Sequence, residues 1–239
     1  MVDLAGKTFG FVGTGTITEA IVTGLAGTEL GATAIVLSPR NEAVSSRLAE
    51  AFANVEVAES NQDVLDRADI VFIAVRPQIV ADVLDALEFR PDHHVISLVA
   101  ATSIDVLRNW IPEPIPLSRA IPLPFVADLQ GATAIYPRDA LSAAIFSKLG
   151  TAVEVEGSRE FDLLAAASAL MGTYFGLLDA VTGWLGDKGL PPSASDPYMR
   201  QLFSGLAQAA SARPETSFER LVVEHSTAGG LNEQVLRDF

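Results

Sequence analysis

Short apolar runs alternate with longer amphipathic stretches through the first two thirds of the chain. The runs are rich in β-branched and aromatic residues, and they predict strands at 8–12, 34–37, 70–75, 95–99, 115–120, 132–136 and 152–155. Between them, apolar residues recur at helical spacing and predict helices at 17–25, 42–52, 79–87 and 140–149. Strands that alternate with helices in this way are typical of βαβ units around a parallel sheet.

The pattern changes after Gly157. Residues 161–185 form a long apolar segment that is almost free of charge, and no strand pattern follows it. A helix that is apolar on nearly every face has to be buried on every face, and the short remainder of the chain cannot easily cover it. We therefore expect an α/β domain with a Rossmann-type doubly wound sheet at 1–157, followed by an all-α dimerisation domain at 158–239 that forms a homodimer.

Charge and composition narrow the range of partners. The formal net charge of −14 repels phosphate backbones, so we expect no nucleic-acid partner. The chain has no cysteine, and its first residues lack the basic flank and apolar stretch of a signal peptide. We also expect none of its apolar runs to reach the roughly 20 residues that span a bilayer. These features indicate a cytoplasmic protein with no membrane partner.

The sharpest motif lies between the first strand and the first helix. Glycines here let the backbone turn tightly and approach a pyrophosphate, which would then accept hydrogen bonds from the start of the helix. Thr18 stands where the third glycine of a G-x-G-x-x-G pattern is usual. An ordinary strand-to-helix turn is the alternative, but the context favours dinucleotide binding by Gly13, Thr14, Gly15, Thr16 and Ile17.

The residues after the second strand indicate which dinucleotide is bound. An NAD-binding protein places Asp or Glu there against the ribose hydroxyl, whereas this chain has Ser38, Arg40 and Asn41. A hydroxyl, a guanidinium and an amide suit a 2′-phosphate, so we expect NADPH rather than NADH. The alternative for Arg40 is a solvated loop residue.

A third cofactor segment follows the strand at 70–75. Open α/β sheets bind ligands at the carboxyl ends of their strands. We therefore add a cofactor contact by Ala74, Val75, Arg76 and Pro77, although Arg76 can also be read as a surface charge before a helix.

Hydroxyls and glycines gather again near the C-terminus, just ahead of an amphipathic stretch at 231–239. Such a sequence forms a helix N-terminus whose N–H groups can hold a carboxylate, or else a plain capping turn between helices. We assign substrate binding to Ser226, Thr227, Ala228, Gly229 and Gly230. We assign no metal, because His93 and His94 follow Pro91 in what we expect to be a solvated turn and His225 stands alone.

Taken together, these segments resemble pyrroline-5-carboxylate reductases over nearly the whole chain. The matching pieces are Phe9 to Gly15 with Glu19-Ala20-Ile21, residues 68–78, residues 96–101, Arg119 to Pro122, and the Gly229-Gly230 loop. The resemblance implies an NADPH-dependent oxidoreductase that reduces the ring C=N bond of pyrroline-5-carboxylate in proline biosynthesis. It also implies dimers whose helical domains interlock.

The chain departs from this family at the substrate side. Leu123 stands where the family has an asparagine, and Asn232 occupies the position whose hydroxyl, in the family, donates to the imine nitrogen. An amide N–H can also donate there, so we expect Asn232 to be the catalytic residue. Three functions stay open: reduction of pyrroline-5-carboxylate itself, reduction of a related imine or carbonyl substrate, and a non-catalytic NADPH-binding dimer of the same fold.

Overall fold

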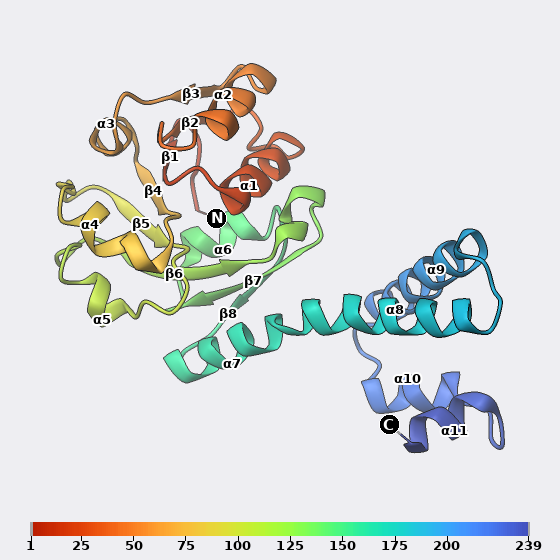
Figure 1. Cartoon of the computed structure of the whole chain (residues 1–239). Helices are drawn as coiled ribbons and strands as arrows, with labels where there is room; N and C mark the ends of the chain where they lie inside the picture. Colours follow the sequence, from red (N-terminus) through yellow and green to blue (C-terminus); the bar gives the residue numbers. More distant parts are fainter. Residues whose placement is uncertain (1, 239) are drawn as a thin grey trace. The chain divides into compact units, whose positions relative to one another are not determined.

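The computed structural model describes residues 2–238 and divides the chain into two compact units, Met1–Ser168 and Ala169–Phe239 (Figure 1). Within the described residues of the first unit, eight strands form one sheet in the order β3-β2-β1-β4-β5-β6-β7-β8. Their bounds are β1 (Thr8–Val12), β2 (Ala34–Leu37), β3 (Val55–Val57), β4 (Ile70–Ile73), β5 (His94–Ser97), β6 (Leu117–Pro122), β7 (Gly131–Tyr136) and β8 (Gly150–Glu154).

The strand order reverses at β1, which pairs in parallel with β2 on one side and with β4 on the other. The pairs β2–β3, β4–β5, β5–β6 and β7–β8 are parallel too, whereas β6 and β7 run antiparallel. A mostly parallel sheet that is extended in both directions from β1 is a doubly wound sheet, so the predicted fold class is confirmed.

Helices cover both faces of this sheet (Figure 1). Strand β4 shows why, because Ile70 and Phe72 point into one core while Val71 and Ile73 point into the other. The first core is closed by α1 (Thr16–Ala26), α2 (Glu42–Ala51) and α6 (Ala140–Phe146). The second is closed by α3 (Asn61–Arg67), α4 (Val80–Leu84) and α5 (Ile104–Leu107).

Two short 3-10 turns, η1 (Pro77–Ile79) and η2 (Pro124–Asp128), complete the sheet domain. The 3-10 turn η1 includes the first residue of the helix predicted at 79–87. Within that predicted range, only α4 is α-helical. Strand β4 ends at Ile73, two residues earlier than predicted, because the chain turns away before Pro77.

The expectation of a solvated turn at His93 and His94 is wrong. His93 is buried, its Nδ1 accepts from the Arg90 N–H at 3.0 Å, and its Nε2 lies 2.9 Å from the Leu65 carbonyl oxygen. Burial lowers the pKa of His93. His94 begins β5, and its Nε2 lies 2.8 Å from Oδ2 of Asp139. Within residues 2–238, no group of three metal-binding side chains comes together.

The helical segment predicted at 161–185 is two helices, α7 (Ser158–Ser168) and α8 (Leu170–Asp187). Helix α7 packs on β7, where the buried Phe161 ring lies 6.2 Å from the ring of Tyr136, centroid to centroid. For that reason α7 groups with the first unit, whereas the composition had placed the domain boundary at 157.

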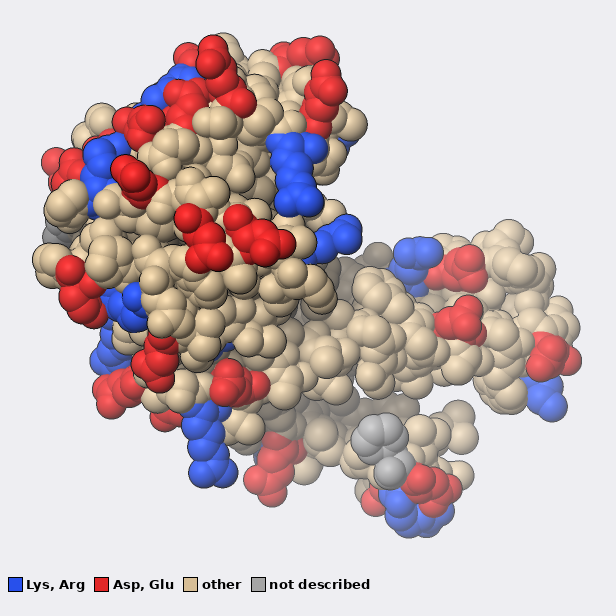
Figure 2. Space-filling view, turned by 60° about the vertical axis from the view of Figure 1, so that its left-hand side comes forward, with Lys and Arg blue, Asp and Glu red and all other residues tan. Residues whose placement is uncertain are grey.

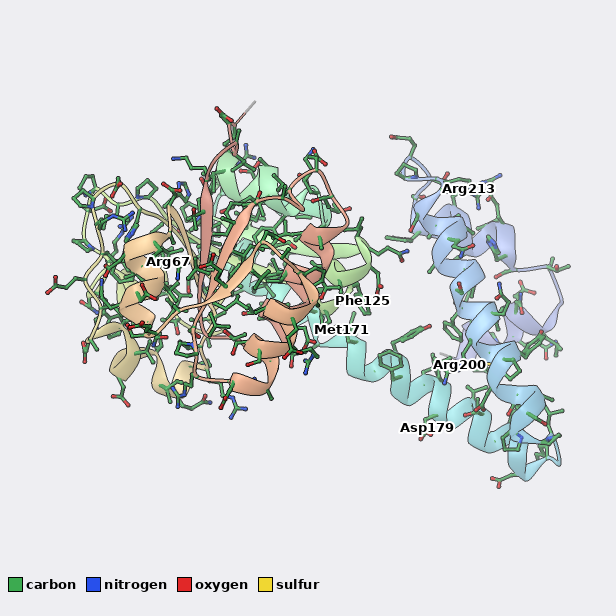
Figure 3. All side chains as sticks on the ribbon, turned by 90° about the horizontal axis from the view of Figure 1, so that it is seen from above. Arg67, Phe125, Met171, Asp179, Arg200 and Arg213 are labelled. Atoms are coloured by element: carbon green, nitrogen blue, oxygen red, sulfur yellow. The ribbon has the colours of Figure 1, made fainter. Side chains whose placement is uncertain are left out.

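The second unit continues with α9 (Pro192–Ser211), α10 (Phe218–His225) and α11 (Leu231–Asp238). Helices α8 and α9 contact each other, with the ring of Tyr174 edge-on to that of Phe203 at 5.4 Å. Figure 3 labels Met171 and Asp179 on α8 and Arg200 on α9. No residue of α8 is buried in the described structure, so the packing within this unit leaves the helix largely uncovered.

One apolar segment is longer than the sequence pattern led us to expect. Residues Ser158–Asp187 are long and apolar enough to cross a membrane by length and composition, which corrects the expectation that no run reaches that length. Only 6% of the most apolar window is buried inside the structure. One such helix is weak evidence for a span, because an apolar helix that packs against protein passes the same test.

Candidate active site

The glycine turn after β1 lies at the point where the strand order reverses. Gly13 has a φ of +103°, and a Cβ there would come within 2.5 Å of the Ala74 carbonyl oxygen. The position therefore requires glycine for its conformation and for the close approach of two strand ends. Gly15 is the N-cap of α1, and a Cβ there would meet no described atom within 4 Å. The space in front of this helix is open to a ligand.

Ser38 holds the glycine turn in place. Its hydroxyl accepts from the Gly13 N–H at 2.9 Å, while the Thr14 hydroxyl donates to the Ser38 carbonyl oxygen at 2.9 Å. Ser38 is fully buried, so its side chain faces the turn and not the solvent. The Asn41 amide donates to the Thr14 carbonyl oxygen at 2.9 Å and fastens the turn from the other side.

Thr18, which stands in for the third glycine of the motif, has a clear structural use. Its hydroxyl donates to the Gly13 carbonyl oxygen at 2.8 Å, and the residue is fully buried. Thr16 and Ile17 open α1, with Thr16 exposed and Ile17 packed against the core. The first helical turn is thus rigidly attached to the end of β1.

Arg40 differs from its neighbours because its side chain stays in solvent. It is exposed and makes no salt bridge within residues 2–238. The loop from Ser38 to Asn41 contains no carboxylate. Of the three polar side chains that we expected at a 2′-phosphate, Arg40 is therefore the one that is free to reach a ligand.

The segment after β4 lies beside the glycine turn. The Ala74 N–H donates to the Val12 carbonyl oxygen at 2.8 Å, so the pairing of β1 and β4 continues to this point. Arg76 caps the 3-10 turn that begins at Pro77, and both residues are exposed, whereas Val75 is half-buried. The structure thus brings the three predicted cofactor segments to one edge of the sheet, at the carboxyl ends of β1, β2 and β4.

The C-terminal glycine loop belongs to the second unit. Ser226 ends α10, and the exposed Thr227 and Ala228 follow it. Gly229 has a φ of +72°, and the Gly230 N–H donates to the Thr227 carbonyl oxygen at 2.8 Å. The loop therefore closes a tight turn directly before α11.

Two side chains of α11 turn back onto this loop. The Glu233 carboxylate accepts from the Gly229 N–H at 2.6 Å, and the Asn232 amide donates to the His225 carbonyl oxygen at 2.6 Å. Glu233 thereby occupies one of the donors that we expected to hold a substrate carboxylate. Asn232, the expected catalytic donor, is engaged with the backbone.

Arg119 is a buried cation to which the sequence assigned no role of its own. Its guanidinium carbon lies 4.4 Å from the centroid of the Phe161 ring, and Nη1 lies 4.0 Å from a carboxylate oxygen of Asp162. Burial lowers the pKa of Arg119, and the Asp162 carboxylate opposes that shift. The Nε atom is buried without a hydrogen-bond partner in the described structure. The sequence signal was present, because a lone charge inside a buried strand is unusual.

A second group of polar side chains lies at the edge of the sheet opposite to the glycine turn. Asp139 is the N-cap of α6, accepts from the Ser142 N–H at 3.1 Å and pairs with His94. Burial opposes ionisation of Asp139, but the hydrogen bonds from His94 and Ser142 outweigh it and lower the pKa of Asp139 to about 2. This cluster lies at the amino end of β5, away from the glycine turn, so its role is in stability.

Known proteins match the N-terminal part of the chain and also nearly its whole length. Residues 8–101 match the family described as NADP oxidoreductase coenzyme F420-dependent. A pyrroline-5-carboxylate reductase of Pseudomonas aeruginosa is 28% identical over 96% of this chain and 87% of its own length.

Solved structures agree on the fold. A pyrroline-5-carboxylate reductase of Coxiella burnetii superposes with a TM-score of 0.83 at 23% identity, covering 97% of this chain and 88% of that one. The Plasmodium falciparum pyrroline carboxylate reductase, solved with NADP bound, gives 0.80 at 17% identity over 99% and 90% of the two chains. The chain is therefore similar to pyrroline-5-carboxylate reductases along almost its whole length, in sequence and in fold.

Proposed function

We propose that the protein is an oxidoreductase that uses NADPH to reduce the C=N bond of a small cyclic imine, with the conversion of pyrroline-5-carboxylate to proline as the first reaction to test. The observation that carries this proposal is the glycine turn at the reversal of the strand order, fixed by Ser38 and open in front of α1. The similarity to a pyrroline-5-carboxylate reductase over 96% of the chain supports the reaction class.

The residues at the carboxyl edge fit the cofactor. The backbone from Gly13 to Ile17 would hold the pyrophosphate at the start of α1, and the exposed Arg40 would pair with the 2′-phosphate. Residues 74–77 would lie along the adjoining part of the dinucleotide. When bound, NADPH supplies the hydride, and the task of these residues is to bind and orient it.

The C-terminal loop is our proposed substrate site. Residues 226–230 and the first turn of α11 contain backbone N–H groups that suit a carboxylate, and the Gly229 N–H becomes available when Glu233 releases it. For Asn232 to donate to the imine nitrogen, its amide must leave the His225 carbonyl oxygen. This role therefore requires the loop to rearrange when substrate binds.

A second copy of the chain is the proposed cover for the apolar helices. The side chains of Leu170, Phe175 and Trp184 on α8 are each more than half exposed. Figure 2 shows many charged side chains on the visible face of the N-terminal unit, whereas α8 carries only two charged residues, Asp179 and Asp187. Such an apolar surface would be covered in a homodimer. We also propose that the protein lies in the cytoplasm, so light scattering without detergent should show a dimer. If the protein stays in solution only with detergent, the apolar helices would instead lie in a membrane.

The decisive experiment measures NADPH oxidation by purified protein with pyrroline-5-carboxylate and then with other cyclic imines, alongside NADPH binding by fluorescence. Turnover that saturates with an imine supports the proposed function. Tight NADPH binding without turnover of any imine would favour the non-catalytic NADPH-binding dimer instead.

A further inference from the structure

An apolar cavity of about 240 Å³ opens at the carboxyl end of β6. Strand β6 and the residue after it contribute Ile121 and Leu123, the neighbouring strands contribute Ala134 and Val153, and α7 contributes Leu164 and Ala167. All of its lining lies within residues 121–168 and none of it is charged. The cavity therefore belongs to the first unit alone.

The two hydroxyls in the lining do not make the cavity polar. The Ser168 hydroxyl donates to the Ala165 carbonyl oxygen at 2.6 Å. The Thr133 hydroxyl oxygen is itself buried below the surface and has no partner in the described structure. A polar or charged group that entered the cavity would lose its hydrogen bonds to water without gaining others from the lining. An apolar group has no such hydrogen bonds to lose.

The cavity opens at the same edge of the sheet as the proposed cofactor site. Strands β1, β4, β5 and β6 are parallel neighbours, so their carboxyl ends meet at one edge, with adjacent strands roughly 4.8 Å apart. In this fold the two halves of a dinucleotide lie on either side of the strand-order reversal. Arg40 follows β2 on one side, and the cavity lies on the other, which is the side of the reactive half.

The size of the cavity limits what it can hold. Pockets that take a whole small ligand measure roughly 300–1,000 Å³, so about 240 Å³ suits one substituent of a larger molecule. Its walls select an apolar substituent. Leu123, the residue after β6, completes this apolar wall.

We propose that this cavity is a substrate subsite for an apolar group, and that the preferred substrates are cyclic imines that carry an alkyl or aryl substituent on the ring. The inference rests on the proposed imine reduction and names the substrate class of that site.

The test fills the cavity from α7. Ala167→Leu adds side-chain volume at a solvent-accessible helix position that lines the cavity, and Ala166→Leu adds the same volume one residue away, outside the lining. We expect the unaltered protein to have a higher kcat/KM for 2-phenyl-1-pyrroline than for unsubstituted 1-pyrroline. Ala167→Leu should lower the value for the phenyl compound about tenfold and leave that for 1-pyrroline within about twofold, since a few methylene groups in an apolar pocket change specificity by this order. Ala166→Leu should change neither.

Binding is measured separately from turnover. In the presence of NADPH, 2-phenylpyrrolidine should raise the melting temperature of the unaltered protein and of Ala166→Leu but not of Ala167→Leu. If this pattern holds while no imine is reduced, the subsite stands and the proposed reaction fails. Equal protection of both variants, or equal kcat/KM values for the two imines, would overturn the subsite. So would a loss of dimer in Ala167→Leu with unchanged ligand selectivity, because the cavity would then hold a second copy.

Discussion

The backbone N–H of Gly229 donates to the carboxylate of Glu233 at 2.6 Å. Glu233 lies in the first turn of α11 and reaches back over the helix start, in the manner of a capping box. The arrangement places a negative charge of the chain itself where we propose that the negative charge of a substrate binds. The two carboxylates would compete for the same N–H and repel each other.

Replacing Glu233 should therefore improve the binding of a carboxylate substrate. We expect Glu233→Gln to lower KM for pyrroline-5-carboxylate several-fold with little change in kcat, because glutamine can keep the capping hydrogen bond without the charge. Glu219→Gln is the matched control, since Glu219 lies on α10 and makes no hydrogen bond or salt bridge within the described residues. An unchanged KM in both variants would mean that Gly229 does not bind the substrate carboxylate.

Ser38 should affect cofactor binding without touching the cofactor. Ser38→Ala removes the acceptor of the Gly13 N–H and leaves that donor unpaired at the turn. A lost hydrogen bond at a buried site costs about 1–3 kcal/mol, so we expect NADPH to bind roughly tenfold more weakly and the free energy of unfolding to fall by a similar amount. Fluorescence titration and urea unfolding measure the two effects. Weaker binding with unchanged stability would instead indicate direct contact between Ser38 and the ligand.

The strands that were predicted well are those that the sheet buries on both faces. Residues 8–12 and 34–37 match β1 and β2, because their continuous apolar runs have no other stable environment. Strand β3 was missed, since it has only three residues at the sheet edge and one of them is Glu56. Helix α3 was missed as well, although Ser60 and Asp63 carried a capping signal that the structure uses.

In the candidate active site, too, the sequence predicted local features but not contacts between distant segments. The glycine turn is local and could be predicted from five consecutive residues. The inward direction of the Ser38 side chain could not, since it depends on how β2 packs beside β1. Nor does the sequence show that α7 packs over Arg119, because that contact joins residues of two distant segments.

Arg40 should determine the preference between the two dinucleotides. We expect Arg40→Glu to raise the Kd for NADPH about 100-fold and to leave that for NADH nearly unchanged, since a carboxylate repels a 2′-phosphate and accepts from a ribose hydroxyl. Lys188→Glu makes the same charge change in the other unit and controls for the overall field. If both cofactors lose affinity equally, Arg40 contacts a part that they share.

The pair formed by Asp139 and His94 should make the fold sensitive to acid. The pKa of Asp139 is lowered from 3.8 to about 2 in the folded state, so its ionised form is stabilised by folding. Its contribution is fully present above pH 4 and is lost as the pH falls from about 4 to about 2. The shift corresponds to roughly 2 kcal/mol. Guanidinium unfolding across this range should show a steeper loss of stability for the unaltered protein than for Asp139→Asn, which cannot ionise. Parallel curves for the two proteins would assign the acid sensitivity to other carboxylates.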